Sequence, residues 1–156
     1  MNKQALSRRL RAILVGIALC GLIFYAFLLP YFASQLLGGT AFAFWAYMCF
    51  LWISGIPCYA VLVYAWRIVS NIGHDRSFTE ENALFLRRIS TLAALDAAYI
   101  LAGNPILILL GVGHAMFMVL SVIIIFAGVA VAVAAAALSH LVLRAAELQE
   151  QSDLTI

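Results

Sequence analysis

Charged side chains are scarce in this chain. Only 10% of its 156 residues are charged, against about a quarter in an average soluble protein, whereas 66% are apolar. A soluble domain of this size cannot cover its surface with so few polar residues. The composition therefore excludes a soluble enzyme, a disordered chain and a nucleic-acid-binding module.

Paired cysteines and metal-binding clusters are missing as well. The cysteines Cys20, Cys49 and Cys58 lie in apolar stretches without C-x-x-C spacing, and we interpret them as small packing residues. The three histidines lack the spacing of a metal site. A net charge of +2 is too small to indicate direct binding to nucleic acid. We expect no catalytic residues, no metal and no cofactor.

Long apolar runs make up most of the sequence. A bilayer core of about 30 Å needs about 20 apolar residues in a helix, and four stretches qualify, at about 12–31, 41–66, 89–110 and 115–143. Backbone groups in lipid must be paired within their own segment, so each stretch should be helical. The sequence predicts an all-α fold, a single four-helix transmembrane domain over 1–156 with a loop at 67–88 and a tail at 144–156. The first run is too long for a signal peptide, and we expect it to be retained.

The positive charges indicate an orientation. All nine Lys and Arg residues lie before the first span, between the second and third spans, or after the fourth. An excess of Lys and Arg marks the cytoplasmic side of a membrane protein. With an even number of spans, both termini are predicted to be cytoplasmic, and only two short uncharged turns face the other side.

Small residues recur at four-residue spacing in two spans. Ala12, Gly16 and Cys20 form one such row, and Gly128, Ala132 and Ala136 form another. Small residues let helices approach closely in lipid. These rows suit packing within one bundle or between copies in a homo-oligomer, and the sequence leaves both open.

Asp96 is the one acidic residue inside a span. A charged side chain in a membrane helix is costly and calls for a partner. Because the fourth span returns toward the cytoplasm, we predict a contact between Asp96 and His140. This pair would be a proton or cation site, or else a structural clamp. A protonated Asp96 bonded to Ser54 or Tyr59 is the other alternative.

The polar loop between spans two and three ends in a helix start. Thr79 is a suitable N-cap residue, and Glu80 and Glu81 follow in the first turn, where the helix dipole favours anions. Ser77 with Glu80 offers an alternative capping box. The segment is either a plain helix start or an exposed docking surface that includes Phe78, Thr79, Glu80, Glu81 and Asn82.

The carboxyl-terminal tail is polar and acidic before it ends on apolar residues. The fourth helix is expected to continue past the membrane to about Gln149. The tail is either frayed or a short linear contact for a protein. Its candidate docking residues are Glu147, Glu150, Asp153, Leu154, Thr155 and Ile156.

Two motifs together resemble a known family. The run Ser77-Phe78-Thr79-Glu80-Glu81-Asn82 with Leu86-Arg87-Arg88-Ile89, and the acidic tail ending in Asp153-Leu154-Thr155-Ile156, resemble the bacterial membrane family named domain of unknown function 2975. The length and the four spans match too. Gln151-Ser152 replaces the more usual Glu-Asn, a minor departure.

The resemblance implies a small protein of the bacterial cytoplasmic (inner) membrane without an assigned activity. Members are often encoded beside a short helix-turn-helix protein of the Xre/Cro type. This implies a non-enzymatic membrane partner that docks or sequesters such a regulator. The alternatives are a small transporter or channel built on Asp96, with proline kinks at Pro57 and Pro105, and a structural subunit of a larger membrane complex.

Overall fold

The chain forms four long helical rods. The computed structural model describes residues 3–37, 40–74 and 78–153. Helix α1 (Lys3–Ile23), the π-helical turn η1 (Phe24–Leu28) and helix α2 (Leu29–Leu36) join into the first rod, followed by α3 (Ala41–Gly73), α4 (Glu80–Leu109) and α5 (Ala115–Asp153). Each rod is long and apolar enough to cross a membrane. The predicted all-α, four-span membrane fold is confirmed.

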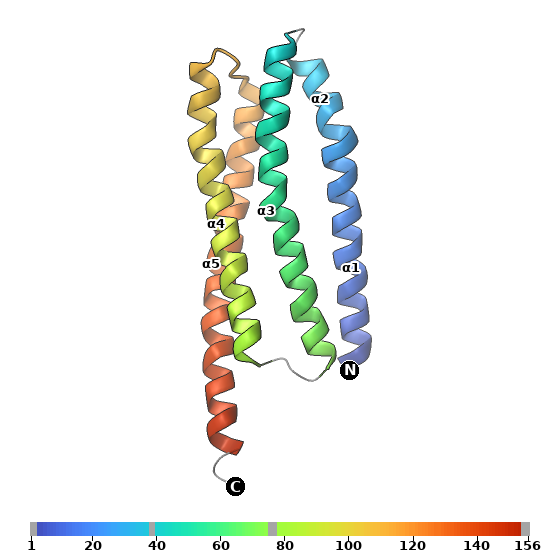
Figure 1. The fold of residues 1–156 in the computed structure, drawn as a ribbon, viewed down its shortest axis with the longest axis vertical. Helices are drawn as coiled ribbons and strands as arrows, with labels where there is room; N and C mark the ends of the chain where they lie inside the picture. Colours follow the sequence, from blue (N-terminus) through green and yellow to red (C-terminus); the bar gives the residue numbers. More distant parts are fainter. Residues whose placement is uncertain (1–2, 38–39, 75–77, 154–156) are drawn as a thin grey trace.

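The rods run up and down, so that both chain ends lie at the same end of the bundle (Figure 1). Helix α1 packs mainly on α3, α3 on α4, and α4 most extensively on α5. Helix α5 extends beyond the other rods at the end that holds the termini (Figure 1). We call that end the polar end and the opposite one the far end.

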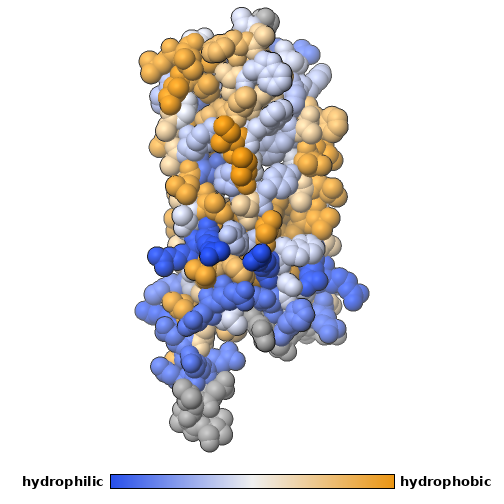
Figure 2. All heavy atoms as spheres, viewed as in Figure 1, coloured by the Kyte–Doolittle hydropathy of each residue, from blue (hydrophilic) through white to orange (hydrophobic). Residues whose placement is uncertain are grey.

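The surface divides sharply by polarity. In the view of Figure 2, hydrophobic and intermediate residues cover the shaft of the bundle, and most strongly hydrophilic residues gather toward the polar end. Large apolar side chains such as Phe27 and Phe126 are 71% and 77% exposed. In lipid, an exposed apolar side chain carries no free-energy penalty. Helices there associate through close packing and hydrogen bonds, and not through the hydrophobic effect. The shaft is therefore the surface that contacts the bilayer.

The best-packed part of the interior lies toward the far end. Tyr47 stacks on Phe117 with ring centroids 4.5 Å apart, and its hydroxyl accepts a hydrogen bond from the His114 backbone at 3.0 Å. Phe50 stacks on Tyr99 at 5.0 Å. These contacts join α3 to α4, to α5 and to the turn between them.

The first rod contains a proline that the structure accommodates with a π-helical turn. In that turn the backbone N–H of Leu29 bonds to the carbonyl of Phe24, so the next bond in register would run from residue 30 to Tyr25. Pro30 has no N–H to donate. The indole N–H of Trp52 donates to the Tyr25 carbonyl instead, at 3.3 Å. Trp52 thus links α3 to the first rod through a backbone group that lipid could not satisfy.

The small residues of α5 pack against α4. A Cβ placed at Gly128 would contact Ala97 at 3.3 Å, and Ala132 is buried while its carbonyl accepts from Ser90 at 2.7 Å. Ala136 is exposed. Small residues at 128 and 132 therefore serve the α4–α5 interface within one bundle.

The other small-residue row lies outside the bundle contacts. Ala12, Gly16 and Cys20 are exposed on α1, and a Cβ at Gly16 would meet nothing within 4 Å. This row does not pack against another described element of the chain.

Candidate functional site

Asp96 is buried at membrane depth. It lies eight residues after Arg88 on α4, about 12 Å along the helix, and its side chain is 9% exposed. Oδ2 accepts a weak bond from Cys58 Sγ at 4.0 Å, and the buried Ser54 lies next to the carboxyl. Oδ1 is enclosed and has no hydrogen-bond partner among the described residues. Half of the buried carboxyl is therefore left without a donor.

A groove of about 320 Å³ lies beside this carboxyl. All four rods contribute to its wall. We call it the Asp96 groove, lined by Asp96 together with residues that include Ile17, Tyr25, Cys58, Tyr59, Gly128 and Val131. Its wall is mostly apolar, and Ile17 and Val131 are 50% and 45% exposed. The groove therefore opens onto the lipid-facing surface between α1 and α5.

The predicted contact between Asp96 and His140 is not formed. The hydroxyl of Ser139, the neighbour of His140, donates to the carbonyl of Ala83 at 2.7 Å. Ala83 lies thirteen residues before Asp96 on α4, a distance of about 20 Å along the helix. His140 is itself exposed near the polar end. The pairing prediction was wrong because α5 continues well past the level of Asp96 before it reaches His140.

The other partners considered for Asp96 are placed differently. The Tyr59 hydroxyl donates to the carbonyl of Ala18 at 3.0 Å, which leaves its proton engaged with α1. Ser54 is buried and lies next to the carboxyl. Of the two proposed partners, Ser54 is the one that the structure brings to Asp96.

The start of α4 is capped as the sequence predicts. The side chain of Thr79 accepts from the backbone N–H of Asn82 at 3.3 Å, and Glu80 and Glu81 occupy the first turn. Ser77, the alternative cap, lies outside the described residues. Phe78, directly before the cap, is 56% exposed.

Asn82 does not belong to a docking surface. It is 1% exposed, and its Oδ1 accepts from Asn71 Nδ2 at 2.8 Å. Asn71 also reaches Glu81 Oε2 at 3.5 Å. The expectation that Asn82 presents a side chain to a partner was wrong, because this amide joins the end of α3 to the start of α4. Phe78, Glu80 and Glu81 remain exposed.

Replacing Thr79 by alanine should destabilise the start of α4. The hydroxyl supplies an acceptor for an N–H that has no partner in the helix, and losing such a cap costs about 1 kcal/mol. Thermal unfolding of the purified protein in a mild detergent measures the change, with Thr79→Ser as the control that keeps the hydroxyl. Equal unfolding temperatures for Thr79→Ala and the wild type would contradict the capping role.

The end of α5 protrudes from the bundle. Because Ser139 lies opposite Ala83, the residues after it reach beyond the start of α4 (Figure 1). Glu147, Leu148 and Glu150 are exposed there. The helix extends to Asp153, further than the predicted end at about Gln149. Leu154, Thr155 and Ile156, also predicted to dock, lie outside the described residues.

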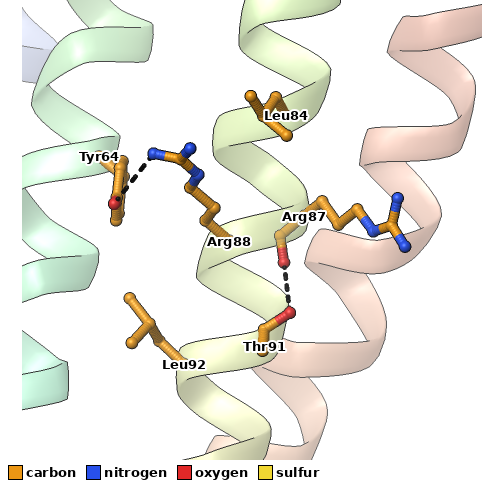
Figure 3. Close-up of a pocket in the computed structure, with 6 residues that line it drawn as sticks. All are labelled: Tyr64, Leu84, Arg87, Arg88, Thr91 and Leu92. Atoms are coloured by element: carbon orange, nitrogen blue, oxygen red, sulfur yellow. Dashed lines mark hydrogen bonds between the residues drawn. The ribbon is translucent and has the colours of Figure 1, made fainter.

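Two arginines, Arg87 and Arg88, are among the residues that line a second cleft, of about 350 Å³, near the polar end. Arg88 points toward α3, donates to the Tyr64 hydroxyl at 3.4 Å and lies over its ring (Figure 3). Arg87 points to the other side of α4, while its carbonyl accepts from Thr91 at 3.0 Å (Figure 3). The two guanidinium groups diverge, so each suits a separate anionic headgroup at the membrane border rather than one shared phosphate.

The first helix is tied to α3 at the polar end by contacts that the sequence analysis did not predict. Ser7 donates to the carbonyl of Val69 at 3.0 Å. Arg11 donates to Ser70 at 3.2 Å and lies over the Trp66 ring, 5.6 Å from its centroid. Ser7 is small and lies among cations, and no local pattern distinguishes it from a solvent-exposed serine.

Comparison with known proteins identifies the family of this chain. The profile of the family described as "Protein of unknown function (DUF2975)" matches residues 31–156. The chain belongs to the DUF2975 family. It is also 26% identical, over the full length of both chains, to the "Uncharacterized membrane protein YoaS" of Bacillus subtilis (strain 168). No solved structure matches the chain.

Membership in DUF2975 confirms the resemblance drawn from the segment at 77–89 and the acidic tail. The matched range contains Asp96, the capped start of α4 and the end of α5. Most of the first rod, including Ile17 and Tyr25 of the groove, precedes it. The family description assigns no activity, so a function has to be argued from the described side chains.

Proposed function

We propose that this DUF2975 protein is a non-enzymatic protein of the bacterial inner membrane, with both termini in the cytoplasm, that docks or sequesters a small Xre/Cro-type helix-turn-helix regulator. The observation that carries the proposal is that α5 passes the acidic first turn of α4 and continues beyond it as an exposed end. Hydrogen bonding between Ser139 and Ala83 keeps the two elements together. Both expose side chains without burying them in the bundle.

The charge on these two elements suits a basic partner. Glu80, Glu81, Glu147 and Glu150 are all exposed at the polar end. A cluster of like charges attracts a surface of opposite sign and speeds its association. The surface of a regulator that contacts DNA is basic, so docking would compete with DNA binding.

Two apolar side chains supply contact area within this acidic surface. Phe78 is 56% exposed and Leu148 is 66% exposed. A few well-buried apolar anchors surrounded by polar contacts carry most of the energy of typical protein interfaces. Phe78 and Leu148 are the anchors that this proposal requires, and the acidic residues form the rim.

The experiment is co-purification of the regulator encoded beside the gene, in mild detergent, with matched variants. Deletion of 147–156 and the double variant Glu80→Lys with Glu81→Lys should each weaken binding by about tenfold or more, since 1.4 kcal/mol corresponds to a factor of ten. Raising the salt concentration should weaken wild-type binding, because salt screens exposed charges. Gln149→Ala changes an exposed, uncharged residue of the same helix and serves as the control. Unchanged binding after the deletion and the double reversal would overturn the proposal.

Two other functions have less support from the residues. A transporter or channel would use Asp96, yet the four spans contain no second acidic residue to form a relay with it. Loss of ion or solute flux in Asp96→Asn, with the fold intact, would favour transport. A structural subunit would use the free row at Ala12, Gly16 and Cys20, and the mass of the particle in detergent would reveal its partners.

A further inference from the structure

The Asp96 groove is lined by a carboxyl that the described residues satisfy only in part. Oδ1 of Asp96 is enclosed and unpaired among the described residues, and the side chain is nine-tenths buried. The other contacts of the carboxyl are Ser54 and a long bond from Cys58 at 4.0 Å. A buried acceptor without a donor is unfavourable, and a buried charge without a partner is more so.

Cationic side chains lie away from this carboxyl. All nine Lys and Arg residues fall outside the apolar spans. The nearest one along α4 is Arg88, about 12 Å away along the helix, and its guanidinium is engaged with Tyr64. Among the described residues, no cationic side chain therefore neutralises the Asp96 carboxyl.

The shape and the wall of the groove indicate what kind of molecule that is. A volume of about 320 Å³ is at the lower end of the range for small-ligand sites, which are mainly apolar with few polar groups. The half-exposed Ile17 and Val131 flank an opening toward lipid. A ligand would therefore enter sideways from the bilayer. Such a ligand must dissolve in lipid and also carry a polar group for the carboxyl, so it must be an amphiphile.

We propose that the Asp96 groove binds an alkyl amine. Its N–H groups donate to the carboxyl of Asp96, which lines the groove, and its positive charge pairs with the carboxylate at a depth where water does not compete. Its hydrocarbon chain lies along the apolar wall and leaves through the opening between α1 and α5. This site is separate from the acidic surface at the polar end, so either proposal can fail without the other.

The test uses the full-length protein in nanodiscs of phosphatidylcholine, with dodecylamine as the probe and dodecanol as its uncharged match. Dodecylamine should raise the unfolding temperature and change the tryptophan fluorescence, since Trp52 bonds to the backbone of Tyr25 in the groove wall. Empty nanodiscs correct for partitioning into lipid. Dodecanol, with the same hydrocarbon chain, should bind at least about tenfold more weakly. The reason is that hydrogen bonds to charged groups are stronger than those between neutral groups.

Two variants separate the carboxyl from the apolar wall. Asp96→Asn keeps the size of the side chain and should reduce dodecylamine affinity by about tenfold or more. Ala127→Phe places a larger side chain at an exposed position of the groove wall. It should prevent binding of both dodecylamine and dodecanol while it leaves the carboxyl in place. Equal binding of dodecylamine and dodecanol to the wild type, or undiminished dodecylamine binding by either variant, would overturn the proposal.

Discussion

Gly103→Leu is expected to destabilise the bundle severely, whereas Gly16→Leu is expected to be tolerated. A Cβ at Gly103 would overlap the ring of Phe50. That ring cannot move aside easily, because it is buried and stacked on Tyr99, whose hydroxyl donates to the Phe50 carbonyl at 3.2 Å. Overpacking a filled interior costs about 1–3 kcal/mol, and occasionally more.

The two glycines form a matched pair. Both lie inside helices, so each substitution gains the same helix propensity from the loss of a glycine. The difference in the free energy of unfolding between the two variants therefore reports the effect of packing alone. Unfolding in mixed detergent micelles measures the free energy of unfolding of each variant. Gly16→Leu should leave it unchanged or raise it by up to about 1 kcal/mol, because nothing lies within 4 Å of the added carbon and the helix loses a glycine. Equal destabilisation by both substitutions would show that α3 and α4 do not pack as described.

The fold could be predicted from the sequence because its signals are local. Four apolar runs identify the spans through hydropathy alone, and Thr79 with two following glutamates identifies the start of α4 through capping chemistry. Neither inference needs to know how the helices pack. Both agree with the structure for this reason.

To predict the partner of Asp96, one must know which residue of α5 lies at the same level as Asp96 on α4. The prediction of His140 was wrong because it misjudged this alignment. In the structure Ser121 of α5 donates to Asn104 of α4, and Ser90 donates to the carbonyl of Ala132. Counting equally in both directions from the turn at 111–114 places Val129, the neighbour of Gly128, opposite Asp96. His140 then lies about three helical turns further on. The sequence contained enough to exclude His140, because rods joined by a short turn run in register from it.

Other side chains could not be placed without the tertiary structure. Asn82 looks like a polar residue in an exposed first turn, and only the arrival of Asn71 from α3 explains its burial. Trp52 looks like a packing residue, and only the π-helical turn before Pro30 reveals the carbonyl that it serves. The Asp96 groove likewise depends on four rods that meet at one level. A polar residue inside a span shows that a partner is needed, and packing decides which one.

The proposed orientation, with both termini in the cytoplasm, predicts an all-or-none labelling result. The native cysteines Cys20, Cys49 and Cys58 are first replaced by alanine, and a single cysteine is introduced as Thr40→Cys or Ser152→Cys. Both positions are exposed, at the far end and at the polar end. Because every Lys and Arg residue lies in a segment assigned to the cytoplasmic side, a membrane-impermeant maleimide should label Thr40→Cys in intact cells and spare Ser152→Cys.

Lysis should make both cysteines reactive, which shows that each is accessible in the folded protein. The result bears directly on docking, because a cytoplasmic regulator can reach Glu80 and Glu147 only if the polar end is inside the cell. Labelling of Ser152→Cys in intact cells would reverse the orientation and remove the regulator from reach. The Asp96 groove would survive that outcome, since an amphiphile dissolved in the bilayer approaches it from the side in either orientation.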